Sequence, residues 1–177
     1  MRVVQLLPEL KVGGVERGTV DLSDHLIKRG HDSAVISAGG QLVDLLNDHG
    51  AKHYNLPIAK KNIRALSQIR NLKKIYLEFQ PDIVHVRSRF PAWINYFALK
   101  NFSDKKPIVV STFHGLYSKP FYSKSMTYAD YRTLLSDLLA EGKSTPTSIT
   151  VVDTIRLILP SINFFIADSF SADFSFP

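Results

Sequence analysis

Short apolar runs alternate with amphipathic segments along most of the chain, and this alternation constrains the fold more than any other feature. The runs have the near-continuous apolar character of strands buried on both faces, and they lie at 2–7, 33–37, 53–56, 83–86 and 108–112. Segments between them have helical periodicity, most clearly 63–79, where an apolar stripe lies opposite arginines and lysines, and a further helix is predicted over 91–100. Strands and helices that alternate in this way form a parallel sheet covered on both faces. The sequence therefore predicts an α/β fold with a Rossmann-like, doubly wound parallel sheet.

The length and composition fit one domain of this kind. A chain of 177 residues with 45% hydrophobic and 21% charged residues is typical of a globular domain with a substantial core. We assign residues 1–177 to one domain, in which the tail 142–177 has no assigned elements. The chain has no cysteine, which excludes disulfides, thiolate metal ligands and cysteine nucleophiles.

The charge indicates which partners the chain attracts. Its formal net charge of +6 favours phosphate groups on nucleotides, lipid head groups or nucleic acid, although the same excess can serve only solubility. No run approaches the roughly 20 apolar residues that span a bilayer, and the first run is too short for a signal peptide. We expect a cytoplasmic chain whose membrane contact is peripheral. Five basic residues are expected either to form a solvated helix face or to contact an anionic membrane: Lys60, Lys61, Arg64, Lys73 and Lys74.

Two adjacent glycines, Gly13 and Gly14, lie between the first strand and the first helix. Free backbone N–H groups at such a helix start can hold a phosphate, whereas the alternative is that the glycines only make a tight turn. A nicotinamide-dinucleotide site would need the pattern GxGxxG and an acidic residue after the second strand, and a Walker loop would need GK[ST]. The sequence has none of these patterns, so both classes of nucleotide site are excluded.

Polar residues follow two later strands. Ligands of doubly wound sheets bind beyond the carboxyl ends of the strands, and arginines there can bind phosphates or sugar hydroxyls. The alternatives are that the histidine of the fourth strand packs in the core and that the last arginine is a solvated loop residue. A histidine at a strand end followed by glycine can face the cleft, although single histidines are more often structural. These residues are His85, Arg87, Ser88 and Arg89 after the fourth strand and His114 after the fifth.

The remaining histidines do not form a metal site. They have no ligand-like spacing with one another or with carboxylates, and none belongs to an HExxH motif. These histidines are His25, His31, His49 and His53. We predict no metal and no cofactor.

Four segments, in this order, resemble bacterial glycosyltransferases of family 4: residues 13–17 (GGVER), 29–31 (RGH), 85–93 (HVRSRFPAW) and 112–117 (TFHGLY). The third segment is similar to a subgroup associated with lipopolysaccharide core and other envelope glycans. The resemblance covers residues 1–141. It implies the N-terminal, acceptor-side domain of a GT-B enzyme.

The resemblance also implies a chemistry. Such an enzyme transfers a sugar from a nucleotide-sugar co-substrate with retention of anomeric configuration and without an essential metal. The acceptor is an envelope glycan or a lipid or lipid-linked molecule, and no nucleic-acid partner is expected. Carried over by position, the resemblance places Gly13 and Gly14 near the donor diphosphate, His114 near the reacting sugar as the catalytic residue, and Arg87, Ser88 and Arg89 along the acceptor cleft.

One element of the family pattern is missing from this sequence. The family's C-terminal domain binds most of the nucleotide-sugar and contains two glutamates separated by seven residues. The glutamates here are Glu9, Glu16, Glu78 and Glu141, and no two have that spacing. The chain is therefore expected to be an N-terminal half, cloned as a fragment or encoded by a split or truncated gene, that is inactive without a separate C-terminal domain.

Two alternatives to an enzyme half remain at this point. The first is a non-catalytic module that binds anionic glycans or an anionic membrane surface, which the net charge of +6 and the missing donor domain favour. The second is a nucleotide-binding protein of another class.

Overall fold

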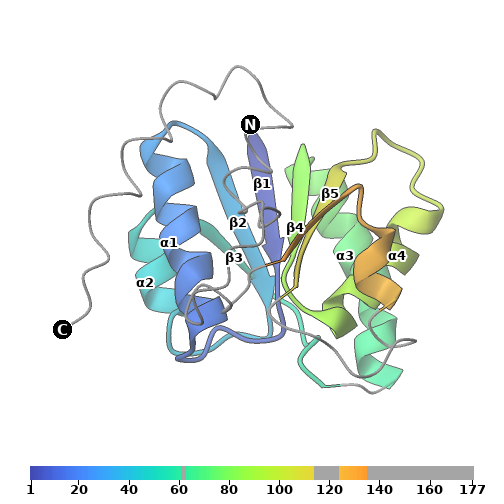
Figure 1. Ribbon diagram of the computed structural model, residues 1–177, viewed down its shortest axis with the longest axis horizontal. Coiled ribbons are helices and arrows are strands. Elements are labelled where there is room, and N and C mark those ends of the chain that lie inside the picture. The colour runs from blue at the N-terminus through green and yellow to red at the C-terminus, as the bar shows by residue number, and fades with distance from the viewer. Residues whose placement is uncertain (61–62, 114–123, 135–177) are drawn as a thin grey trace, which may run out of the picture.

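The computed structural model describes residues 1–60, 63–113 and 124–134, which form a six-stranded sheet with the strand order β3-β2-β1-β4-β5-β6 (Figure 1). Every pair of neighbouring strands is parallel. The elements are β1 (Arg2–Leu6), α1 (Gly14–Lys28), β2 (Asp32–Ser37), α2 (Val43–Asp48), β3 (Lys52–Asn55), α3 (Ile63–Phe79), β4 (Ile83–Val86), α4 (Arg89–Lys100), β5 (Ile108–Phe113), the 3-10 helix η1 (Lys124–Tyr128) and β6 (Tyr131–Leu134).

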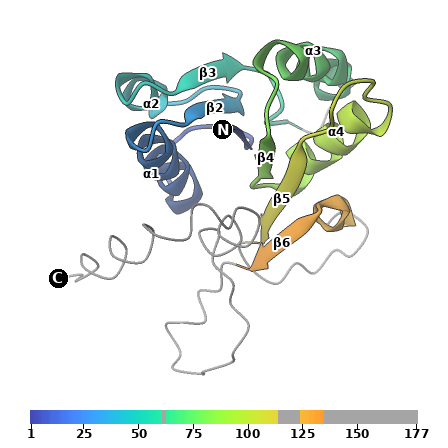
Figure 2. The ribbon, with the colours of Figure 1, turned by 90° about the horizontal axis from the view of Figure 1, so that it is seen from above.

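Helices cover both faces of the sheet, as Figures 1 and 2 show: α1 and α2 lie on one face, and α3 and α4 lie on the other. Each face has its own apolar core. On the α3–α4 face, Val4 and Leu6 of β1 pack with Tyr76 and Ile94 of the two helices. On the α1–α2 face the core includes Val20, Val35 and Leu46. Burial on both sides explains the near-continuous apolar strands, and the predicted doubly wound α/β fold is confirmed.

The helix α4 begins at Arg89, two residues before the predicted start at 91. Pro91 consequently lies in the first turn, where a missing N–H costs nothing because that group would have no partner inside the helix. Ser88 precedes the helix in an extended conformation, and Ala92 donates from its backbone N–H to the Ser88 carbonyl at 3.0 Å. The first turn of α4 thus starts directly after β4, and Arg89 belongs to a helix and not to a loop.

The last described part of the chain adds an element that the sequence pattern did not reveal. A short 3-10 helix, η1, packs against α4 before β6 extends the sheet beside β5. The tail 142–177 and Lys61 lie outside the described residues.

Candidate functional site

The candidate site lies at the carboxyl ends of β1 and β4, which are neighbours in the centre of the sheet. The chain leaves β1 toward α1 on one face and leaves β4 toward α4 on the other face (Figure 2). Where two adjacent strands send their helices to opposite faces, the connecting loops diverge and open a crevice that binds ligands in sheets of this type. The topology therefore brings the glycine pair and residues 87–89 to one edge of the sheet.

The loop from β1 to α1 is fastened to the loop that follows β2. The Leu10 backbone N–H donates to the Gly39 carbonyl at 2.8 Å, and the Leu42 N–H donates to the Leu10 carbonyl at 3.0 Å. Gly40 packs against the backbone of Leu10 so closely that a Cβ on Gly40 would overlap with it. The position of the Gly13–Gly14 segment thus depends on a contact that only glycine allows at residue 40.

The first turn of α1 offers backbone N–H groups to a ligand. Gly13 is the N-cap in an extended conformation, and no side chain of the described residues caps this turn through a hydrogen bond. A Cβ on Gly13 would meet the Glu16 carboxylate, whereas a Cβ on Gly14 would meet no atom of the described residues within 4 Å. The first N–H groups of a helix have no partner inside it, and together with the helix dipole they attract anions. Gly14 leaves open the space from which an anion can approach them.

Arg87 follows β4 and lies beneath α1, where its side chain is buried. Its Nη1 donates to Gln5 Oε1 at 2.9 Å and to Thr19 Oγ1 at 3.0 Å. In the described part of the chain its Nε is buried without a hydrogen-bond acceptor, and no carboxylate there forms an ion pair with it. Burial lowers the pKa of Arg87 to about 10, although the charge of Glu16 acts in the opposite direction. The guanidinium is therefore a buried cation at neutral pH.

A buried polar network fixes the position of this guanidinium. Gln5 is fully buried in β1, and its Nε2 donates to the Thr19 carbonyl at 2.8 Å and to Ser23 Oγ at 2.9 Å. Ser33 of β2 donates to Ser23 Oγ at 3.1 Å. The network joins two strands to α1 and to the segment after β4, so Arg87 and the first turns of α1 are held as one unit. The sequence did not reveal this network, because its members are far apart in the chain and only the strand register brings them together.

The other predicted site residues have more separate environments. Ser88 forms the N-cap of α4, and Arg89 is its first residue, half-buried, with a backbone carbonyl that accepts from Ser125 Oγ at 2.7 Å. His85 is buried in the sheet, where its Nε2 lies 2.7 Å from Thr112 Oγ1. This position agrees with the core role considered for His85. His114 lies outside the described residues, so its catalytic role stays a prediction.

No group of three metal-ligating side chains gathers within residues 1–60, 63–113 and 124–134. Over the same ranges, no helix is both long enough and apolar enough to cross a membrane.

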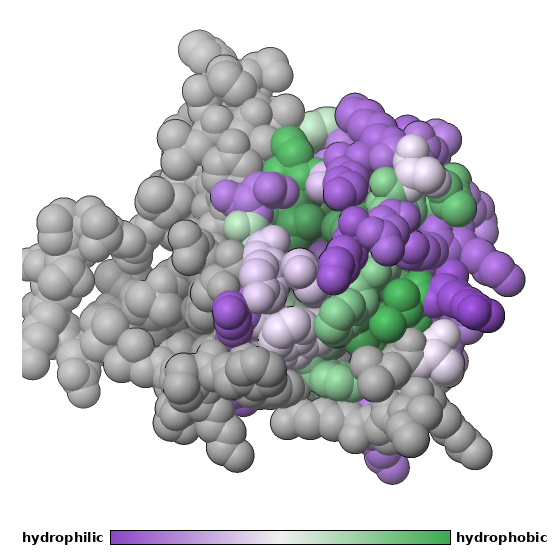
Figure 3. Space-filling model, turned by 90° about the vertical axis from the view of Figure 1, so that its right-hand side faces the viewer, coloured by the Kyte–Doolittle hydropathy of each residue, from purple (hydrophilic) through white to green (hydrophobic). Residues whose placement is uncertain are grey.

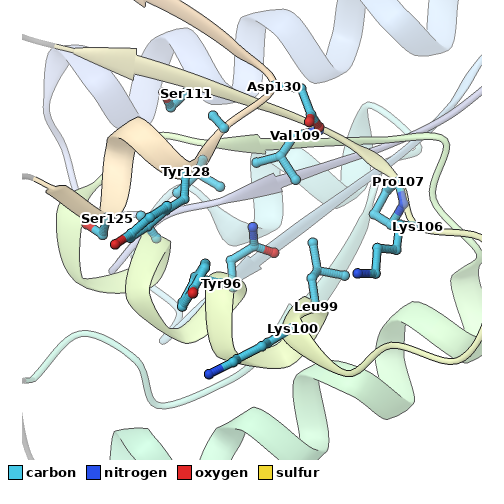
Figure 4. Close-up of a pocket in the computed structure, with 14 residues that line it drawn as sticks. Tyr96, Leu99, Lys100, Lys106, Pro107, Val109, Ser111, Ser125, Tyr128 and Asp130 are labelled. Atoms are coloured by element: carbon cyan, nitrogen blue, oxygen red, sulfur yellow. The ribbon is translucent and has the colours of Figure 1, made fainter.

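A cavity of about 230 Å³ lies beside the site, between α4, β5 and η1 (Figure 4). Tyr96 and Tyr128 line it, and their rings stack with centroids 4.3 Å apart. Lys100 and Lys106 also border the cavity. Sequence reasoning missed this feature, although the density of aromatic residues in the segment 93–97 was a usable signal.

A doubly wound parallel sheet with a helix that starts at its central crevice defines a Rossmann-like domain. The sequence profile of Glycosyltransferase Family 4 matches residues 12–151. The chain belongs to this family. The matched region contains both the first turn of α1 and residues 87–89.

Solved structures agree with this assignment. A glycosyltransferase from Rickettsia africae is similar with 31% identity and a TM-score of 0.65 over 79% of this chain and 38% of that one. The lipopolysaccharide outer core galactosyltransferase WaaB has 19% identity and a TM-score of 0.58, over 85% of this chain and 47% of that one. Anabaena HepE, in complex with UDP and glucose, has 15% identity and a TM-score of 0.52, over 89% of this chain and 50% of that one. The last two show the fold alone.

The chain thus spans half or less of the length of these solved structures. No curated protein matches the chain.

Proposed function

We propose that this chain is the acceptor-side domain of a retaining glycosyltransferase that transfers a sugar from a nucleotide-sugar donor to an envelope glycan or lipid acceptor. The observation that carries the proposal is the open first turn of α1 beside a buried cation, at the crevice between β1 and β4. Membership of Glycosyltransferase Family 4 supports the same reaction class.

In this proposal the donor diphosphate binds at the first turn of α1. Gly14 lets the phosphate oxygens approach the backbone N–H groups, because within residues 1–60, 63–113 and 124–134 no atom lies within 4 Å of the position that a Cβ would take. Arg87 adds a positive charge beneath the same helix. The complex of HepE with UDP and glucose supports a nucleotide-sugar as the ligand class. Negative charge that develops on the leaving phosphate during transfer would be stabilised by these groups.

The remaining predicted residues complete the proposed site. His114 is assigned to the reacting sugar as the catalytic residue, and Ser88 and Arg89 are assigned to the acceptor cleft. The reaction proceeds with retention and without an essential metal or cofactor. The similarity to WaaB supports an envelope-glycan acceptor. We propose that the chain acts in the cytoplasm, at the inner face of the membrane.

The transfer reaction also requires a donor-binding domain. This chain covers 38% of the Rickettsia africae glycosyltransferase and 47% of WaaB, so more than half of each of those chains has no counterpart in the 177 residues. We propose that a C-terminal domain, in the same polypeptide or in a separate one, supplies the rest of the donor site and that the 177 residues alone are inactive.

A second candidate function is a non-catalytic module that binds anionic glycans or membrane lipids. The net charge of +6 favours it. The basic residues first considered for this role include Lys61, which lies outside the described residues, and Arg64, whose side chain does too. A binding module of this kind would bind anionic vesicles or glycans equally well with or without an intact α1 terminus.

Gly14→Ala tests the diphosphate site. The added methyl group meets no atom of the described part of the chain within 4 Å, so the free energy of unfolding should stay within about 0.5 kcal/mol of the original value. Pyrophosphate, which contains the group shared by nucleoside diphosphate donors, should bind about tenfold more weakly because the methyl group blocks its approach. An NMR titration of the 177-residue chain with pyrophosphate measures this affinity.

The matched control is Gly18→Ala in the same helix. A Cβ at Gly18 would lie 3.5 Å from Arg87 Nη2, an ordinary van der Waals contact that leaves the guanidinium in place. This variant should bind pyrophosphate within about twofold of the original chain. Equal affinities of the Gly14 and Gly18 variants would contradict phosphate binding at the first turn of α1.

A further inference from the structure

Four aromatic side chains gather on the outer side of α4 and on η1: Trp93, Tyr96, Phe97 and Tyr128. Trp93 stacks on Phe97 with centroids 5.8 Å apart, and Tyr96 stacks on Tyr128 at 4.3 Å. Trp93 also meets Tyr128 edge-on at 5.8 Å. We call these four residues the α4–η1 aromatic cluster. Because each ring contacts another, the cluster is a continuous apolar surface and not a set of isolated exposed residues.

This cluster is partly open to solvent. Phe97 and Tyr128 each expose 41% of their surface, and Trp93 and Tyr96 are half-buried. Apolar side chains lie between hydrophilic ones on the side of the molecule that Figure 3 shows, where α3 and α4 form the surface. Contiguous exposed aromatic surface of this kind marks a binding face, since single exposed apolar residues are common but clusters are not. Tyrosine and tryptophan suit a partner with an apolar layer beneath a polar one.

Cations surround the cluster. Lys100 and Lys106 are exposed and line the same cavity as Tyr96 and Tyr128 (Figure 4). Lys124 is exposed at the start of η1. The acidic residue at this cavity, Asp130, is engaged with the backbone, because its Oδ2 accepts from the Val109 N–H at 2.8 Å. The face therefore combines an apolar centre with a positive border.

We propose that the α4–η1 aromatic cluster and its lysines dock on the anionic phospholipid surface of a membrane. Aromatic rings with a polar edge are favoured at the head-group level of bilayers, and lysines beside them are attracted to lipid phosphates. Lys100 and Lys106 line the cavity, so a head group that enters it would lie beside two cations. The inference deepens the proposed peripheral location and rests on it, but it does not depend on sugar transfer.

Vesicle co-sedimentation of the 177-residue chain tests this surface without donor or acceptor. The vesicles contain phosphatidylcholine alone or with phosphatidylglycerol, and binding should require the anionic lipid. The variant Lys100→Gln with Lys106→Gln should lower the partition coefficient by roughly tenfold or more. Its matched control, Lys11→Gln with Lys28→Gln, removes the same charge from exposed positions on the α1 side of the sheet and should change the coefficient by less than about twofold.

A second pair of variants tests the apolar part. Phe97→Gln removes an exposed ring of the cluster and should lower binding by roughly fivefold, whereas Leu77→Gln removes an exposed apolar side chain on α3 and should have little effect. Circular dichroism checks that the variants keep their fold. Equal binding by the two lysine pairs, or by the Phe97 and Leu77 variants, would overturn the proposal. Because no nucleotide-sugar is present, this result is independent of the proposed transfer reaction.

Discussion

Gly40→Ala is expected to lower the free energy of unfolding by at least about 3 kcal/mol. Gly40 has a φ of 149°, which side-chain-bearing residues rarely adopt. An added methyl group would overlap with the backbone of Leu10 and lie 2.7 Å from the Lys11 nitrogen. Backbone atoms cannot rotate away, and the hydrogen bonds of Leu10 to the residues around Gly40 hold them in place. Urea unfolding followed by circular dichroism measures the loss.

Gly39→Ala is the matched control for this prediction. Gly39 also has a positive φ, 84°, but among the residues that the structure describes no atom would lie within 4 Å of a Cβ there. Its substitution should lower the free energy of unfolding by only about 1 kcal/mol, which is the cost of a left-handed backbone conformation for a residue with a side chain. If both variants lose the same stability, the close packing of Gly40 on the β1–α1 loop does not hold that loop in position.

Arg87→Met is expected to weaken pyrophosphate binding between about tenfold and a hundredfold, because a charged donor contributes roughly 1.5–3 kcal/mol to a hydrogen bond with an anion. The fold should tolerate the change. Methionine leaves Gln5 Oε1 and Thr19 Oγ1 without the guanidinium donor, which costs about 1–3 kcal/mol. It also removes a buried cation, whose lowered pKa corresponds to a penalty of about 3 kcal/mol. The loss of the donor lowers the free energy of unfolding, and the removal of the buried cation raises it.

The Arg87 variant therefore separates binding from folding. Its free energy of unfolding should stay within about 2 kcal/mol of the original value while pyrophosphate affinity falls. Lys28→Met removes an equal charge from the far end of α1 and should change the affinity by less than about threefold. If the Arg87 variant is unfolded in the absence of ligand, or if its affinity for pyrophosphate is unchanged, then Arg87 stabilises the fold and does not bind the ligand.

The layers of the fold could be predicted from the sequence because burial on both faces leaves a direct pattern. The apolar run at 83–86 is β4, and the amphipathic segment at 63–79 is α3. The sequence predicts the start of α4 at Pro91, two residues too late, because proline is common at the first helical position. Proline is tolerated throughout the first turn, and α4 begins at Arg89.

The environment of the site was less predictable. The sequence placed Arg87 at the edge of the sheet, but its burial beneath α1 depends on the register that pairs Gln5 with His85. Its hydrogen-bond partners Gln5 and Thr19 are 82 and 68 residues away along the chain. No local pattern encodes a contact of that separation. The α4–η1 cluster was hidden for the same reason, because Tyr128 reaches the helix only through η1.

The central claim is that the 177 residues are one side of a two-domain glycosyltransferase. Its most direct test is the release of nucleoside diphosphate from a panel of nucleotide-sugars, in the presence of lipid and glycan acceptors. The 177-residue chain is compared with the complete Rickettsia africae glycosyltransferase and with a chimera that joins this chain to the part of that protein without a counterpart here. We predict turnover by the chimera and at least about a thousandfold less by the chain alone. Turnover by the chain alone at the rate of the complete enzyme would contradict the claim.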